Sequence, residues 1–281
     1  MPVEMIGWIA PRVSSELIPA SGPPFDADVV AETARIHERA GFDRVLIGYF
    51  TDAPDGFLIG AHAASVTERL QFLLAHRPGF VAPPLAARKL ATLDELSRGR
   101  LAVHIISGGS DADQGRDGDW TDHAARYRRS AEYLSVLRRT WTEPTPFDHE
   151  GEFYRTRGTY SEIRCRQKPY IPIYGGGGSE AAVKALAPHV DVYMLWGEPL
   201  KDTAVFMDRV RREAAVYGRR PTFSLSTRPI LADTGEKAWD RARDILDRVL
   251  ANRGGAAAVQ RQNVGSKRLL EAAAEAELHD T

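Results

Sequence analysis

The sequence contains a single cysteine, Cys165, among 281 residues. One thiol cannot form an internal disulfide, which excludes a small scaffold held together by disulfides. Its surroundings, EIRCRQKPY, contain neither a histidine nor a nucleophile motif, so we interpret Cys165 as a half-buried structural thiol. The sequence also lacks a signal peptide and any uninterrupted apolar stretch of membrane-spanning length, and we therefore expect a cytoplasmic protein.

Neither sign of charge predominates, because the sequence contains 37 Lys and Arg residues and 38 Asp and Glu residues. Such a balance gives no overall field that would attract nucleic acid or an anionic membrane. The motifs of several enzyme classes are absent as well: there is no G-x-S-x-G elbow of a serine hydrolase and no G-x-G-x-x-G after the first apolar run. The eight histidines are scattered rather than paired, so we expect no metal site, and a metallohydrolase remains a weak alternative.

What the chain does have is a regular alternation of short apolar runs and amphipathic helical patterns. Such runs are typical of strands covered on both faces. The seven predicted strands are 5–10, 44–48, 70–76, 101–107, 171–174, 190–195 and 222–232. Helical patterns lie between them at 26–40, 83–98, 122–141 and 202–218, another follows at 238–253, and 147–155 reads as a β-hairpin.

The alternation predicts an α/β fold, a TIM (β/α)₈ barrel, because polar and glycine-rich loops follow the carboxyl ends of the strands. We expect one barrel domain over residues 1–281, with insertions at its rim over 108–122 and 143–170. An eighth strand is not evident, since the sequence after the last helical pattern reads as loop and polar helix. An open barrel leaves two unpaired edges, so we expect a C-terminally incomplete barrel that forms a homo-oligomer.

The most distinctive loop is PIYGGGGSEAAVKALAP, residues 172–188, in which four glycines, 175–178, precede Ser179. Backbone N–H groups of a glycine-rich turn bind a phosphate without the lysine of a P-loop. A turn that needs positive φ also selects glycine, and Ser179 is then simply a helix N-cap. Both interpretations stay open, and they are compatible.

A second polar loop, SGGSDADQGRDGDWTDH over 107–123, has the alternating aspartates of a calcium loop but fails in detail, and we interpret it as a solvated active-site loop. At its end, His123 and Tyr127 are four residues apart on one helix face. Either His123 simply supports the helix N-terminus, or the pair points to the same anion as Ser179. His76 ends the third predicted strand and is either a site residue or a satisfied histidine at the core edge. Aromatic residues at strand ends suit a planar, phosphate-bearing cofactor.

Several ordered segments resemble one family, among them LAARKLATLDELSRGRLAVHIISGGS, TDHAARYRRSAEYLSVLRRTW, PYIPIYGGGGSEAAVKALA and DVYMLWGEPL. They are similar to the bacterial-luciferase-like flavin monooxygenases, in particular to the alkanesulfonate monooxygenase branch, from about Met5 to about Arg253. The resemblance implies a TIM barrel that uses FMN in its reduced form, FMNH₂, supplied by an NAD(P)H-dependent FMN reductase. It also implies that O₂ oxidises a small organosulfur substrate, with sulfite and an aldehyde as products.

The resemblance also assigns site residues. Those implied for the flavin are Gly178, Ser179, His123 and Tyr127 at the phosphate and ribityl chain, and Ser107 and His76 toward the isoalloxazine ring. Those implied for the substrate and catalysis are Trp196, Ser226 and Arg228.

This chain departs from the family in its substrate half. It has Val13 where the sulfonate enzymes have a His, Ala53 where they have a Cys, and Ser226 and Arg228 where they have Arg and His. Arg12 and Arg228 form either a replacement anion clamp or ordinary rim salt bridges. Two further hypotheses stay open: a deazaflavin-dependent (F420) hydride-transfer oxidoreductase of the same superfamily, and a truncated non-catalytic flavin-binding remnant.

Overall fold

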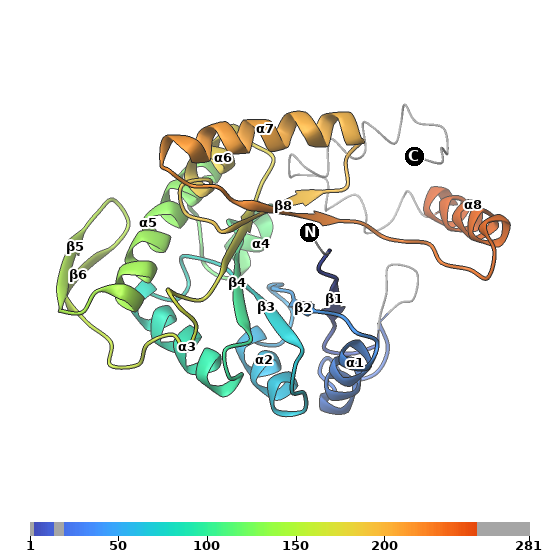
Figure 1. Ribbon diagram of the computed structural model, residues 1–281, viewed down its shortest axis with the longest axis horizontal. Helices are drawn as coiled ribbons and strands as arrows, with labels where there is room; N and C mark the ends of the chain where they lie inside the picture. The colour runs from blue at the N-terminus through green and yellow to red at the C-terminus, as the bar shows by residue number, and fades with distance from the viewer. Residues whose placement is uncertain (1–2, 14–19, 252–281) are drawn as a thin grey trace.

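The computed structural model describes residues 3–13 and 20–251, the last three without their side chains. Its main feature is a curled sheet of seven parallel strands in the order β1-β2-β3-β4-β7-β8-β9 (Figure 1). The strands are β1 Ile6–Ile9, β2 Arg44–Ile47, β3 Gln71–His76, β4 Leu101–Ile105, β7 Ile173–Gly176, β8 Val192–Trp196 and β9 Thr222–Ser226. A separate antiparallel hairpin consists of β5 Phe147–Glu150 and β6 Arg155–Thr159.

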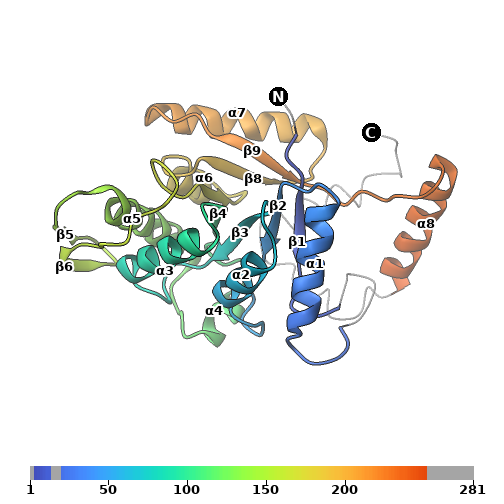
Figure 2. The same ribbon diagram turned by 60° about the horizontal axis from the view of Figure 1, so that its bottom comes forward.

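Most of the helices follow a strand and lie on the outer side of the curled sheet (Figures 1 and 2). They are α1 Ala27–Arg39, α2 Gly56–Ser65, α3 Pro83–Leu96, α4 Asp111–Arg116, α5 His123–Thr142, α6 Glu180–Leu186, α7 Leu200–Val216 and α8 Gly235–Ala251. Their starts follow ordinary capping rules: Asp26 caps α1, and Asp122 caps α5 by accepting a hydrogen bond of 2.9 Å from Ala125 N. Because each crossover places its helix on the same side, the opposite, concave side of the sheet carries no crossover helix among the described residues (Figure 2), and this inner side is called the hollow below.

The two sides of the sheet bury different side chains. The helix-facing side carries the main core, which includes Phe72, Val103 and Ile173. The inner side carries a smaller cluster built on Leu73, Ala102 and Tyr174. Strand alternation therefore assigns each strand residue either to the helix layer or to the hollow.

Arg44 occupies the amino-terminal end of the hollow. Its guanidinium donates to the Tyr174 hydroxyl and to Gln71 Oε1, and only 6% of the residue is exposed. Since the strands are parallel, their carboxyl ends share the opposite edge, where the loops predicted to carry chemistry gather.

The predicted fold class is confirmed, and no eighth parallel strand occurs within residues 3–13 and 20–251. The structure differs from the sequence predictions at several points. β9 ends at Ser226 rather than at residue 232, because Pro229 lacks the N–H that a ladder requires. Helix α2 was not predicted, and the loop predicted over 107–123 contains the helix α4, which Ser110 caps by accepting from Asp113 N. The loop and polar helix predicted after residue 253 lie outside the described residues.

Helix α8 stands apart from the other helices in both views (Figures 1 and 2). None of the helices described is long and apolar enough to cross a lipid bilayer. Cys165 was predicted to be half-buried, but the residue is only 3% exposed, and burial raises the pKa of its thiol to about 12.

Candidate active site

The glycine segment is divided between a strand and a turn. Gly175 and Gly176 are the last two residues of β7, and only 177–178 form the turn that leads to α6. None of the four glycines has positive φ, so the need for a left-handed backbone does not explain them. Close packing against the neighbouring strand explains Gly176, because a Cβ at this position would lie 2.5 Å from the carbonyl oxygen of Met194.

Helix α5 brings two predicted site residues to this turn. The hydroxyl of Tyr127 lies against the turn beside Ser179, and Ser179 caps α6 by accepting from Ala182 N at 3.1 Å. A Cβ on Gly177 would lie 2.5 Å from the Tyr127 hydroxyl oxygen, so only glycine allows this approach. The ring of His123 packs edge-on to Tyr127, with 5.1 Å between centroids, and its side chain is exposed. The predicted grouping of His123, Tyr127 and Ser179 therefore exists in the structure.

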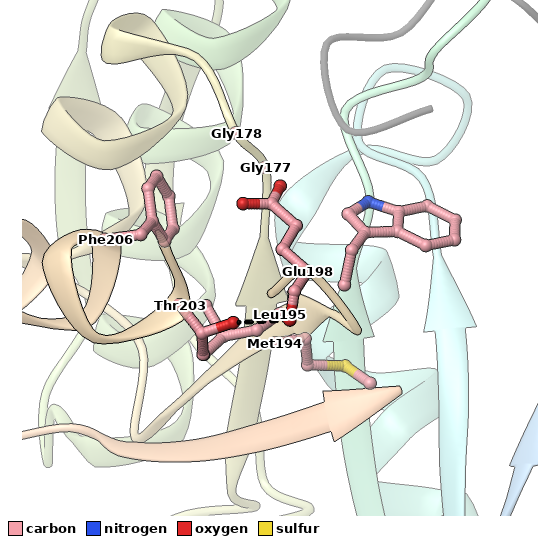
Figure 3. Close-up of a pocket in the computed structure, with 8 residues that line it drawn as sticks. Gly177, Gly178, Met194, Leu195, Glu198, Thr203 and Phe206 are labelled. Carbon is pink, nitrogen blue, oxygen red and sulfur yellow. Dashed lines mark hydrogen bonds between the residues drawn. The ribbon is translucent and has the colours of Figure 1, made fainter. Parts of the chain in front are cut away.

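The other side of the turn faces a pocket between β8 and α7. Its lining consists of Gly177, Gly178, Met194, Leu195, Trp196, Glu198, Thr203 and Phe206 (Figure 3). The Glu198 side chain points toward the glycine turn in this view, and Thr203 Oγ1 donates to the Glu198 carbonyl at 3.0 Å. The negative charge of Glu198 disfavours a phosphate in the pocket between β8 and α7. The side of the turn that faces α5 is therefore the better place for an anion.

The structure places His76 and Ser107 in the helix layer rather than in the hollow. His76 is 4% exposed and hydrogen-bonds through Nε2 to the Tyr133 hydroxyl on α5, and burial lowers its pKa to about 4. The Ser107 hydroxyl lies 2.8 Å from that of Ser130, which donates to the Arg126 carbonyl. Both side chains are thus engaged with α5, and their predicted contact with a flavin ring stays a prediction.

The predicted substrate residues lie at the carboxyl ends of β8 and β9. Trp196 and Ser226 end these strands as register partners, and Trp196 is 38% exposed. Arg228 follows β9, and its side chain is exposed. Arg12 follows β1, so the two arginines of the predicted clamp lie near opposite edges of the open sheet. The clamp itself stays a prediction.

The loop over 108–122 is held by side-chain interactions of two aspartates, Asp119 and Asp117. Asp119 accepts from the guanidinium of Arg129, one of these hydrogen bonds being 3.1 Å long. Burial alone would raise the pKa of Asp119, but the Arg129 hydrogen bonds lower it. At the other point, Asp117 accepts a 2.9 Å hydrogen bond from Tyr49 and lies 3.7 Å from Arg77 Nη1. The loop therefore packs over the ends of β2 and β3.

A family model described as luciferase-like monooxygenase matches residues 5–281. The chain belongs to this family.

Solved structures of other luciferase-like proteins share the fold. EDTA monooxygenase from Chelativorans sp. BNC1 superposes with a TM-score of 0.76 at 17% identity over 87% of this chain and 66% of that one. The oxygenating constituent of 3,6-diketocamphane monooxygenase from Pseudomonas putida, in complex with FMN, gives 0.71 at 17% over 89% and 74%. Coenzyme F420 dependent tetrahydromethanopterin reductase from Methanopyrus kandleri gives 0.72 at 18% over 99% and 84%. This chain thus spans just under two thirds of the length of the EDTA enzyme.

The turn of this luciferase-like chain fits a flavin phosphate by its chemistry. Two hydroxyl groups, Tyr127 and Ser179, and the exposed imidazole of His123 gather beside a turn of two glycines. Hydroxyl, imidazole and backbone N–H groups are the donors that a phosphate needs. By contrast, no three His, Cys, Asp or Glu side chains in the described ranges come together in a way that would hold a metal ion.

The sequence did not reveal Tyr193, whose side chain hydrogen-bonds to the backbone of the glycine turn. Tyr193 on β8 is fully buried and donates a 2.8 Å hydrogen bond from its hydroxyl to the Gly177 carbonyl. Burial raises the pKa of Tyr193 well above its usual value, so this hydroxyl stays a donor. The only sequence signal was a polar hydroxyl inside the apolar run VDVYML, which by itself does not indicate a partner.

Proposed function

We propose that this protein is an FMN-dependent monooxygenase of the alkanesulfonate type. It receives reduced FMN from a separate NAD(P)H-dependent FMN reductase and uses O₂ to oxidise a small organosulfur substrate. For an alkanesulfonate, one oxygen atom of O₂ is added to the carbon bonded to sulfur, and the C–S bond breaks to give sulfite and an aldehyde. The other oxygen atom of O₂ is released as water. Reduced flavin supplies the two electrons and the oxygen-activating chemistry when it is bound.

The observation that carries this proposal is the meeting of α5 with the glycine turn at the carboxyl edge of the sheet. Tyr127 and Ser179, which are more than fifty positions apart in the sequence, lie side by side at this turn, and the ring of His123 packs against Tyr127. In a parallel barrel this edge is where ligands bind. In the proposed complex these three side chains hold the phosphate, and the turn supplies backbone N–H groups.

The proposed substrate position lies further along the same edge. The exposed indole of Trp196 provides an apolar wall, and Ser226 stands next to it at the end of β9. Arg228 is proposed to attract the sulfonate, because an arginine fork matches the oxygens of such an anion. We further propose that the protein acts as a homo-oligomer.

Binding of the cofactor is the first test. Purified protein is titrated with FMN and, without oxygen, with reduced FMN, and quenching of flavin fluorescence or absorbance difference spectra give the affinities. We expect saturable binding that weakens when Ser179 is replaced by alanine. Absence of binding of both forms by the wild-type chain contradicts the flavin assignment.

The substrate class is tested separately with an added FMN reductase, NAD(P)H and a series of linear alkanesulfonates. We expect substrate-dependent release of sulfite, together with oxygen uptake. Oxygen uptake that yields only hydrogen peroxide, whichever sulfonate is present, would contradict the organosulfur proposal while leaving the flavin site intact.

A deazaflavin-dependent hydride transfer is the second candidate. It is favoured by the match to the tetrahydromethanopterin reductase, which covers 99% of this chain. Hydride transfer consumes no O₂, so oxygen uptake with reduced FMN distinguishes the two functions. Tight binding of the deazaflavin without binding of FMN would favour this candidate.

A further inference from the structure

Arg44 differs from the other buried arginines of the described residues, because it has no carboxylate beside it. At most 8% of each of four arginines is exposed: Arg44, Arg77, Arg126 and Arg129. The last three have nitrogens 2.5–3.7 Å from the oxygens of aspartates. Both hydrogen bonds of the Arg44 guanidinium go instead to uncharged side chains, those of Tyr174 and Gln71. Buried charges are normally paired, so this one calls for a counter-charge.

The position of Arg44 shows where that counter-charge belongs. Arg44 precedes Leu46 of the inner cluster by two positions, so its side chain points to the inner side of the sheet. It starts on β2 and reaches Tyr174 on β7, and β3 and β4 lie between these strands. The guanidinium therefore crosses the amino-terminal end of the hollow, and we call the part lined by Arg44, Gln71 and Tyr174 the floor. Ligands of parallel barrels bind at the opposite, carboxyl edge, so the floor is separate from the candidate active site.

The floor has more hydrogen-bond donors than acceptors. Nε of Arg44 is enclosed and has no acceptor. The hydroxyl oxygen of Tyr174 accepts from Arg44, and its own O–H donates to no described residue. Burial raises the pKa of Tyr174, so the hydroxyl keeps this proton at neutral pH. The amide oxygen of Gln71 is already used by Arg44. What the floor lacks is thus an acceptor with negative charge.

The acidic side chains near the floor do not supply it. Asp43, which precedes Arg44 in the chain, accepts a 2.7 Å hydrogen bond from a backbone N–H. Asp191 forms a 2.7 Å ion pair with Arg219. Glu4 is exposed and forms no ion pair with Arg44. The counter-charge must therefore come from outside the described residues.

The burial of the floor limits what such an anion can be. Only 6% of Arg44 and 5% of Tyr174 is exposed, so only a small group has access to them. A phosphate or an organic sulfonate carries several oxygens that would lose their water, and the floor offers too few donors to replace it. A single-atom anion with one charge matches one guanidinium and one hydroxyl group.

We propose that the floor of the hollow binds a small monovalent anion such as chloride, held by the guanidinium of Arg44 and the hydroxyl of Tyr174. The ion neutralises the buried charge and thereby stabilises the folded chain. It takes no part in the chemistry at the carboxyl edge, so this inference does not rest on the proposed function.

The test measures thermal unfolding of the full-length chain while sodium gluconate is replaced stepwise by sodium chloride. Ionic strength stays constant, so screening of surface charges does not change. An anion that binds only the folded state raises the melting temperature by mass action. At a chloride concentration about ten times the dissociation constant, we expect the wild type to melt about 3–6 °C higher than in gluconate.

Four variants assign the effect to the floor. Arg44→Met removes the charge and should abolish the rise, and Arg44→Lys, which keeps the charge, should retain part of it. Tyr174→Phe should need about three- to tenfold more chloride for the same rise, as expected for one lost hydrogen bond. Arg77→Met is the matched control, because it removes a buried arginine that already lies 3.7 Å from Asp117, and it should keep the full rise. An equal rise in Arg44→Met and wild type would place the anion elsewhere and overturn the inference.

A second measurement needs no variant. Wild-type protein should broaden the ³⁵Cl resonance of the buffer, and added bromide, a competing monovalent anion, should narrow it again. If the wild type neither broadens this resonance nor melts higher in chloride than in gluconate, the floor holds water rather than an anion and the inference is wrong. Flavin titrations of the same protein decide the proposed function independently of either result.

Discussion

Replacing Gly176 by alanine should force two central strands apart. The added Cβ would lie 2.5 Å from the backbone oxygen of Met194, in the strand that pairs with β7, whereas real Cβ atoms essentially never come closer than 3.0 Å to such an atom. The strands must therefore separate locally by about half an ångström. A backbone carbonyl in a parallel ladder cannot rotate away as a flexible side chain does, because its hydrogen bonds fix it.

Overpacking of this kind typically costs about 1–3 kcal/mol. For a chain of this size a loss of 1 kcal/mol lowers the melting temperature by about 2–4 °C, so we expect Gly176→Ala to melt about 2–12 °C lower. Because Gly176 directly precedes the turn, its displacement should also weaken FMN binding. Thermal unfolding followed by circular dichroism gives the first quantity, and fluorescence quenching gives the second.

Gly235→Ala is the matched control. It makes the same chemical change at the first residue of α8, where an added Cβ meets nothing within 4 Å. Alanine is also the better helix former, so this variant should melt at or slightly above the wild-type temperature. A Gly176→Ala protein that melts with the wild type would refute the close-approach explanation of the glycine segment.

Three further predictions concern single side chains. Tyr127→Phe removes the hydroxyl that lies at the glycine turn beside Ser179 and should weaken FMN binding about three- to tenfold. Tyr154→Phe removes a buried hydroxyl without a partner and should leave binding unchanged in the same titration. Asp119→Asn breaks a buried ion pair and should lower the free energy of unfolding, measured in urea at pH 7, by about 3–5 kcal/mol. Since the pKa of Asp119 is lowered in the folded state, the difference in unfolding free energy between wild type and variant should shrink as the pH falls below about 4. A difference that stays constant with pH would contradict this. Cys165 should react with a thiol reagent only after unfolding, and rapid labelling of the native protein at pH 8 would show that the thiol is accessible.

The sequence was sufficient for the order of the seven parallel strands and for most of the helices between them, because most strands are short apolar runs followed by a helical pattern; α2 and α4 were not predicted. The helix predicted over 26–40, for example, lies over Ala27–Arg39 between its capping Asp26 and Gly41. The grouping of Tyr127 with Ser179 was also predictable. Ser179 follows the carboxyl end of a predicted strand, and Tyr127 lies in the first turns of a helix that follows another such strand.

Which way a strand side chain points was not predictable. The run LAVHIIS is apolar on both sides, so its pattern does not show which residues face the helices. The family resemblance implied that Ser107 points toward the isoalloxazine ring, whereas the structure places its hydroxyl against Ser130 of α5. Tertiary packing alone fixes this choice.

Helix α5 links surfaces that a sequence scan treats as separate. Its first turns carry His123 and Tyr127 at the glycine turn, and its middle carries Glu132, which accepts hydrogen bonds from His149 in the β5–β6 hairpin and from the backbone N–H groups of Phe153 and Tyr154. A ligand that immobilises the start of this helix therefore restrains the distant hairpin as well. Slowed amide exchange in the hairpin would report an occupied phosphate position, even for a ligand without colour or fluorescence.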